Sequence, residues 1–81
     1  MNNRKDFKMC SLMEKDALIE KVAETLALVA RHQSADEEPN QDRKAMRALR
    51  HHLYRSEPDD LDFSAIVHQC DTVQAKYRIA V

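Results

Sequence analysis

The chain of 81 residues contains no glycine and no tryptophan. Glycine is the residue that best tolerates a positive φ, and several enzyme signatures depend on it. Its absence excludes the phosphate-binding P-loop, the dinucleotide-binding fingerprint and the Gly-x-Ser-x-Gly nucleophile elbow. It also disfavours two-residue β-hairpins. Strong helix formers are plentiful instead, so the composition predicts a helical protein.

Long hydrophobic runs are lacking as well. The longest apolar run, residues 26–30, is five residues long and cannot span a membrane. Residues 1–8 are charged and lack the apolar stretch of a signal peptide, so we expect a cytoplasmic location. Two cysteines, Cys10 and Cys70, lie far apart in the sequence, and we expect free thiols in a reducing compartment.

Residue patterns typical of catalytic and metal sites are also missing. No Cys-x-x-Cys, His-x-x-x-His or Glu-x-x-His spacing occurs, and the adjacent His51 and His52 would point about 100° apart on a helix. Cys70 has Gln69 and Asp71 as neighbours, which supply no general base, so we interpret it as a small buried hydrophobe. We therefore expect no enzymatic activity, no metal and no cofactor.

The first two helices are predicted from their start signals. Ser11 and Glu14 have the spacing of a capping box, and the apolar residues that follow repeat with helical periodicity over 12–33. Asn40 is a suitable N-cap for a second helix over 41–55.

A third helix is predicted over 59–79. Ser56 is the expected N-cap, and Pro58 is well placed for a first turn. Asp62 or Asp71 could each cap a new start, so two shorter helices are the alternative for this stretch.

Three apolar stripes joined by short connectors predict an all-α fold, a small antiparallel up-and-down bundle of three main helices. The number of helices rises to four or five if the N-terminal tail forms a helix of its own and the C-terminal helix is split in two. Residues 1–10 are assigned to a polar tail or short helix, and residues 11–81 to a single domain. The predicted core consists of Leu18, Val22, Leu26, Val29, Met46, Leu49, Leu53, Phe63, Ile66, Cys70, Val73 and Tyr77.

Charge is segregated along the chain. Residues 43–55 carry five Lys or Arg and no acid, whereas residues 34–42 and 56–62 carry four acids each. Helix starts and connectors explain most of the acids, because carboxylates are favoured near helix N-termini. Helix capping does not explain the basic residues in the middle of the second helix.

The basic residues of the second helix form the main candidate binding surface. The second helix has a narrow apolar stripe made of Ala45, Met46, Leu49 and Leu53. The side of the helix opposite this stripe carries, at helical spacing, Arg43, Arg47, Arg50 and Tyr54. Leu28 is a second candidate, because it is an apolar residue on the polar face of the first helix.

The function we expect is that of a small non-enzymatic cytoplasmic adaptor or regulatory protein, whose partner is another protein or a second copy. Nucleic acid is a weaker alternative, since the flanking acids would repel a phosphate backbone approaching the basic helix over 43–55. In overall shape, a glycine-free series of four or five short amphipathic helices is similar to saposin-like bundles, which include small bacterial secretion factors. The usual saposin disulfides are absent. This similarity implies a lipid- or membrane-binding module, with a role in secretion, as the other alternative.

Overall fold

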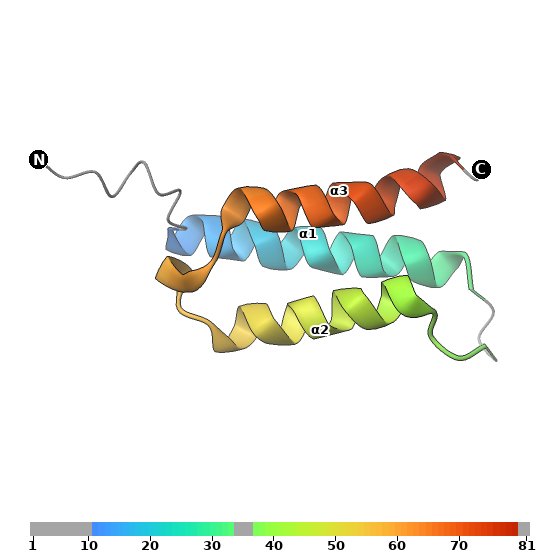
Figure 1. Ribbon diagram of the computed structural model, residues 1–81, viewed down its shortest axis with the longest axis horizontal. Coiled ribbons are helices and arrows are strands. Elements are labelled where there is room, and N and C mark those ends of the chain that lie inside the picture. Colours follow the sequence, from blue (N-terminus) through green and yellow to red (C-terminus); the bar gives the residue numbers. More distant parts are fainter. Residues whose placement is uncertain (1–10, 34–36, 80–81) are drawn as a thin grey trace, which may run out of the picture.

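The computed structural model describes residues 11–33 and 37–79. The predictions for the tail at residues 1–10, including Cys10, lie outside the described residues. The described chain forms α1 (Leu12–Arg31), α2 (Gln41–Arg55), a short 3-10 helix η2 (Pro58–Asp60) and α3 (Phe63–Ile79) (Figure 1).

Consecutive α-helices run in opposite directions, and α1 is the helix on which the other two pack. Figure 1 shows α2 and α3 on either side of α1, and the closest backbone approaches are those of α1 with α2 and of α1 with α3. The prediction of a small all-α antiparallel bundle is confirmed. Because α1 lies between its neighbours, its remaining exposed side forms the outer face of the molecule.

The capping box at the start of α1 is present. The backbone N–H of Ser11 donates to Glu14 Oε1 at 2.9 Å, and the N–H of Glu14 donates to Ser11 Oγ at 3.0 Å. At the other end α1 stops at Arg31, with His32 in the C-cap position. The predicted end at residue 33 was therefore two residues too late.

The second helix has its predicted bounds, but the residue after it has a different role. Asn40 is the N-cap, and its Oδ1 accepts from the Arg43 N–H at 2.9 Å. Ser56 Oγ donates back to the His52 carbonyl at 2.7 Å, while Lys15 Nζ donates to the Ser56 carbonyl at 2.6 Å. The prediction that Ser56 caps the third helix was wrong, because this serine closes α2.

The predicted helix over 59–79 is interrupted near its start. Leu61 has an extended backbone (φ −106°, ψ 138°), and its side chain is buried, with 3% exposed. Asp62 Oδ1 then accepts from the Ala65 N–H at 3.1 Å and caps α3, which continues past Asp71 without a break. Of the two alternative starts, the one at Asp62 is confirmed. Because the helix is interrupted here, the Leu61 side chain points into the core. In a helix continuous over 59–79 the same side chain would point away from the core.

The predicted core is largely confirmed. Leu26, Phe63 and Tyr77 are half-buried and pack against it. The sequence analysis missed Leu61 and two polar residues, Thr25 and Gln74, which have 0% and 3% of their surface exposed. The other predicted residues are buried: Leu18, Val22, Val29, Met46, Leu49, Leu53, Ile66, Cys70 and Val73.

Candidate binding site on the outer face of α1

Three of the four arginines of α2, Arg43, Arg47 and Arg50, lie beside α1. They line the α1–α2 groove, a depression of about 230 Å³ whose lining residues are Leu26, Ala27, Ala30, Arg43, Arg47 and Arg50. Arg43 and Arg50 are half-buried, and Arg47 is exposed. The prediction that this stripe lies opposite the packed side of α2 was wrong for Arg43 and Arg50. The buried strip of α2 is narrow, so the residues that flank it, Arg43 and Arg50, lie at the groove beside α1 and are half-buried there.

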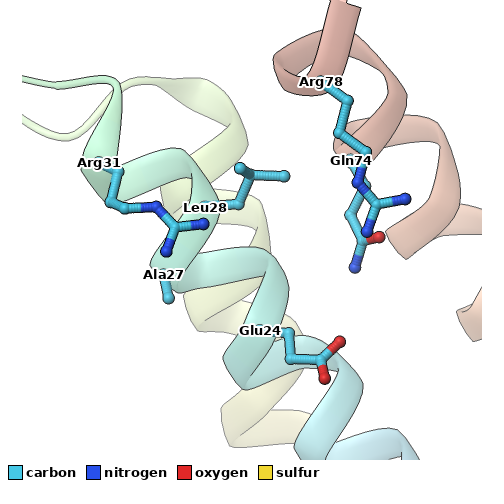
Figure 2. Close-up of a pocket in the computed structure, with 6 residues that line it drawn as sticks. All are labelled: Glu24, Ala27, Leu28, Arg31, Gln74 and Arg78. Atoms are coloured by element: carbon cyan, nitrogen blue, oxygen red, sulfur yellow. The ribbon is translucent and has the colours of Figure 1, made fainter. Parts of the chain in front are cut away.

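A second depression lies on the other side of α1. The α1–α3 groove has a volume of about 360 Å³ and is lined by Glu24, Ala27, Leu28, Arg31, Gln74 and Arg78. Figure 2 shows Leu28 pointing from α1 toward α3, where Gln74 and Arg78 lie. Leu28 is half-buried, so it forms part of a groove wall instead of standing alone on a polar surface.

The two grooves meet on α1, because Ala27 lines both of them. The joined surface has small and aliphatic residues along α1 and cations on both sides, with one acid, Glu24, and one amide, Gln74, in the wall of the α1–α3 groove. We call this surface the arginine face and define it by the residues Leu26, Ala27, Leu28, Ala30, Arg31, Arg43, Arg47, Arg50 and Arg78. Two candidates that the sequence analysis gave separately, the arginines of α2 and Leu28, thus lie on one continuous surface.

None of the five arginines of this face is paired with a carboxylate of the part of the chain that the structure describes. Within residues 11–33 and 37–79 the two ion pairs are Lys21–Asp71 at 2.8 Å and Lys76–Asp42 at 2.9 Å. Neither ion pair includes an arginine. An ion pair with a carboxylate of a neighbouring helix would have been the simplest structural role for these cations, and the described residues do not provide one.

The acid in the first turn of α2 has a different partner. Asp42 accepts from Lys76 Nζ and, at 2.9 Å, from Tyr77 Oη. The hydrogen bond from Lys76 is the main cause that lowers the pKa of Asp42, and that from Tyr77 lowers it further against the opposing effect of burial. Asn40 Nδ2 donates to the same tyrosine oxygen at 2.9 Å, and His32 packs edge-on against the ring at 5.5 Å. This cluster joins the ends of all three helices.

Tyr54 does not join the arginines. Its side chain is 62% exposed, and it is not among the residues that line either groove. Of the four α2 residues predicted to form a site, the structure brings three arginines together in one groove and places Tyr54 outside it.

Four residues of the face were not singled out from the sequence: Ala27, Ala30, Arg31 and Arg78. They come from α1 and α3, and each is unremarkable on its own helix. The sequence does place Arg31 on the exposed side of α1, but only the packing of α3 against α1 brings it into one groove with Arg78.

Cys70 lies in the core and not on this surface. It is fully buried, and burial raises the pKa of its thiol. A protonated, enclosed thiol is a poor nucleophile, which agrees with its interpretation as a small hydrophobe.

The described residues show neither a metal cluster nor a membrane span. No group of three or more His, Cys, Asp or Glu side chains converges there in a way that could hold a metal ion. None of the helices in this part of the chain has the length and hydrophobicity needed to cross a bilayer.

Comparison with known proteins gives no relative. No family model matches the chain, and no curated protein and no solved structure matches it either. We therefore argue its function from the arginine face.

Proposed function

We propose that this chain is a small non-enzymatic cytoplasmic adaptor or regulatory protein that acts through protein–protein contacts. The arginine face is the proposed binding surface, and its partner is a protein segment rich in carboxylates. One observation carries the proposal: five arginines surround an apolar strip of α1, and none of them is paired with a carboxylate of the described chain.

Arginine suits this role for geometric reasons. Its planar guanidinium binds a carboxylate through two parallel hydrogen bonds and is less strongly hydrated than the ammonium of lysine. Arginine is accordingly enriched in protein interfaces. Leu26, Leu28 and Ala27 supply apolar surface between the cations, so that a partner can bury area and form ion pairs at once.

The charges on the rest of α1 favour a protein over a nucleic acid. Asp16, Glu20 and Glu24 are exposed on the same helix that carries the apolar strip of the face. Their carboxylates would repel a continuous phosphate backbone, whereas a protein can place cations and anions where each is needed.

A saposin-like opening toward lipid has less support. Opening the core between α1 and α3 would break the buried hydrogen bond from Gln74 Nε2 to Thr25 Oγ1, 2.8 Å long. The arginine face itself carries no aromatic residue of the kind that anchors helices at membrane surfaces.

The proposal is tested by affinity capture from the native host with the wild-type chain and two charge-matched variants. Arg43→Glu/Arg47→Glu reverses two charges of the face, and Lys44→Glu/Arg55→Glu reverses two exposed charges elsewhere on α2. We expect a stoichiometric protein partner that is lost with the first variant and kept with the second. Capture that does not depend on the first variant would contradict the proposal.

Nucleic acid and lipid are tested in parallel with purified protein. A random duplex at low salt and vesicles of neutral or anionic lipid are the probes. Arginine-dependent binding to the duplex or to vesicles, together with no captured protein, would replace the proposed partner with one of these two classes.

A further inference from the structure

The exposed side of α1 is divided by charge. Asp16, Glu20 and Glu24 are exposed in the first two thirds of the helix, and Arg31 is exposed at its end. The arginines of α2 add to the positive end, because their groove lies over residues 26–30 of α1. The outer face thus has an acidic part followed by a cationic part.

Small residues separate these charges. Ala23 and Ala27 are exposed about one helical turn apart on the same helix, beside Glu20 and Glu24. These two small residues leave room for a second helix between the longer side chains of Glu20, Glu24 and Arg31. The alanines by themselves identify no occupant; the order of the charges does.

The charge order is self-complementary when two copies of α1 meet antiparallel. If a two-fold axis passes between residues 23 and 24, Asp16 of one copy lies opposite Arg31 of the other. Glu20 then lies opposite Ala27, which is the residue shared by the two grooves and is next to Arg47. The two-fold axis repeats each of these pairings, as in any isologous dimer. It also brings Glu24 of one copy beside Glu24 of the other, a single repulsion at the centre that opposes the four attractive pairings.

We propose that the occupant of the arginine face is a second copy of this chain, docked antiparallel along α1. The proposal rests on the proposed function, because it names the partner of the same arginines. In this dimer Asp16 and Glu20 supply carboxylates to Arg31 and Arg47, which have none as partners within the described residues of one chain.

The size of the face fits a modest dimer. The 20 residues of α1 span about 30 Å. Specific interfaces start at about 1,000 Å² of total buried surface, so a dimer of this kind uses the flanking grooves as well as α1 itself. A small domain with one thin core also gains stability from the additional burial.

The experiment is sedimentation equilibrium on the full chain over a concentration series, at low and at high salt. We expect wild type to dimerise, and Arg47→Glu and Glu20→Arg each to raise the dissociation constant by at least about tenfold, because each places like charges together twice. Arg55→Glu is the matched control. It changes the same charge at an exposed position outside the face and is expected to leave the dissociation constant within about threefold of wild type.

Mixing the two single variants is the decisive measurement. An equimolar mixture of Arg47→Glu and Glu20→Arg chains contains heterodimers in which both pairings are again attractive, one with its sign reversed. We expect the mixture to dimerise with nearly the wild-type dissociation constant, although neither variant does so alone. Circular dichroism of each variant verifies that the helices are intact.

The inference is overturned by a monomeric wild type, by a mixture that stays monomeric, or by an Arg55→Glu effect as large as that of Arg47→Glu. Its failure is distinguishable from failure of the proposed function. A monomeric chain that still captures a host protein through Arg43 and Arg47 keeps that function and excludes the second copy.

Discussion

At the scale of single residues, the least expected feature is a polar pair inside the core. Thr25 Oγ1 donates to the Lys21 carbonyl at 2.8 Å and accepts from Gln74 Nε2 at 2.8 Å. No buried side-chain nitrogen or oxygen in the described part of the chain lacks a hydrogen-bond partner. The pair links α1 to α3, and the Gln74 amide has its hydrogen-bond partner only as long as Thr25 is present.

This arrangement predicts that mutation of Thr25 and mutation of Gln74 reduce stability by different amounts. Thr25→Val removes the acceptor and leaves the buried Gln74 amide without a partner, which costs about 1–3 kcal/mol of unfolding free energy. Gln74→Leu costs less, because Thr25 still donates to the Lys21 carbonyl. The double variant is expected to be more stable than Thr25→Val alone, since replacing both partners by apolar groups leaves no unpaired polar group. Urea denaturation of the four proteins gives this comparison.

Thr72→Val is the control for the threonine itself. Thr72 Oγ1 donates to the His68 carbonyl at 2.9 Å in the same back-bonded geometry, but its side chain is exposed. Its replacement is expected to change stability by no more than about 0.5 kcal/mol. An equal loss in Thr72→Val and Thr25→Val would show that the buried pair contributes nothing specific.

A second prediction at this scale concerns Asp42, whose pKa is lowered mainly by its hydrogen bond from Lys76. A carboxyl with a lower pKa in the folded state stabilises the fold above its unfolded pKa of about 3.9. That contribution is lost as the pH falls through the folded value. Asp42→Asn is therefore expected to be less stable than wild type near pH 7, and the difference should shrink as the pH falls below about 4.

The expected difference for Asp42→Asn is at most about 1 kcal/mol, because Lys76 is largely exposed and its charge is screened. Thermal unfolding between pH 2 and pH 7 measures it. Asp59→Asn, at an exposed position in η2, is the control. A difference between Asp42→Asn and wild type that persists unchanged at pH 2 would contradict the assigned role of the ion pair.

Thr25 and Gln74 show why part of the core escapes prediction from sequence. Thr25 follows Val22 by three residues and Leu18 by seven, so its helical position indicated burial even though its chemistry did not. Its partner lies on a helix 49 residues further along. Helical periodicity identifies the buried side of one helix, but it cannot identify a hydrogen-bond partner on another.

At the scale of helices, the two N-caps of α1 and α2 differ in what else they bind. Ser11 and Glu14 form a local, exposed capping box. Asn40 caps α2 through Oδ1 and at the same time donates through Nδ2 to Tyr77 Oη on α3. One side chain thus starts a helix and attaches it to another.

We therefore predict a larger loss for Asn40→Ala than for Ser11→Ala. Removal of an N-cap costs about 0.5–2 kcal/mol, and Asn40→Ala also removes the hydrogen bond to Tyr77. Asn40→Asp separates the two effects, because it keeps the cap oxygen and loses the donor. Its stability in chemical denaturation is expected to lie between those of wild type and Asn40→Ala. Equal losses for Ser11→Ala and Asn40→Ala would contradict the tertiary role.

The helix bounds were predictable where the start signals are local. Ser11 and Asn40 each hydrogen-bond a backbone N–H three residues ahead, and the helices they start were predicted closely. Ser56 has the same chemistry but uses its hydroxyl on the preceding helix, where Lys15 from α1 binds its carbonyl. The contact with Lys15 spans 41 residues, so the role of Ser56 could not be predicted from the residues near it in the sequence.

At the scale of the whole molecule, the candidate site was predictable only in part. The segregation of Arg43, Arg47 and Arg50 is visible in the sequence, as is the misplaced Leu28. Their union into one face depends on how α2 and α3 pack against α1, through Ala27 in particular. Tyr54 shares a side of the isolated helix with the arginines, yet the same packing leaves it outside both grooves.

The antiparallel dimer has a thermodynamic consequence for the entire fold. A partner that binds only the folded chain stabilises it by mass action, so the unfolding midpoint of a dimer rises with protein concentration. Stabilisation reaches about 2.7 kcal/mol when the free partner is at 100 times the dissociation constant. We expect the unfolding midpoint of wild type to increase across a hundredfold range of concentration, and to increase less at high salt, which screens the ion pairs.

The same concentration series on Arg47→Glu and on its mixture with Glu20→Arg makes this prediction specific to the arginine face. The single variant is expected to show a smaller rise of the midpoint over the same range of concentration, because its dissociation constant is higher, whereas the mixture regains the concentration dependence of wild type. Differential scanning calorimetry measures both. A concentration dependence in Arg47→Glu as large as that of wild type would mean that the chains associate through another surface. A midpoint independent of concentration in wild type would mean that the fold is stable as a monomer.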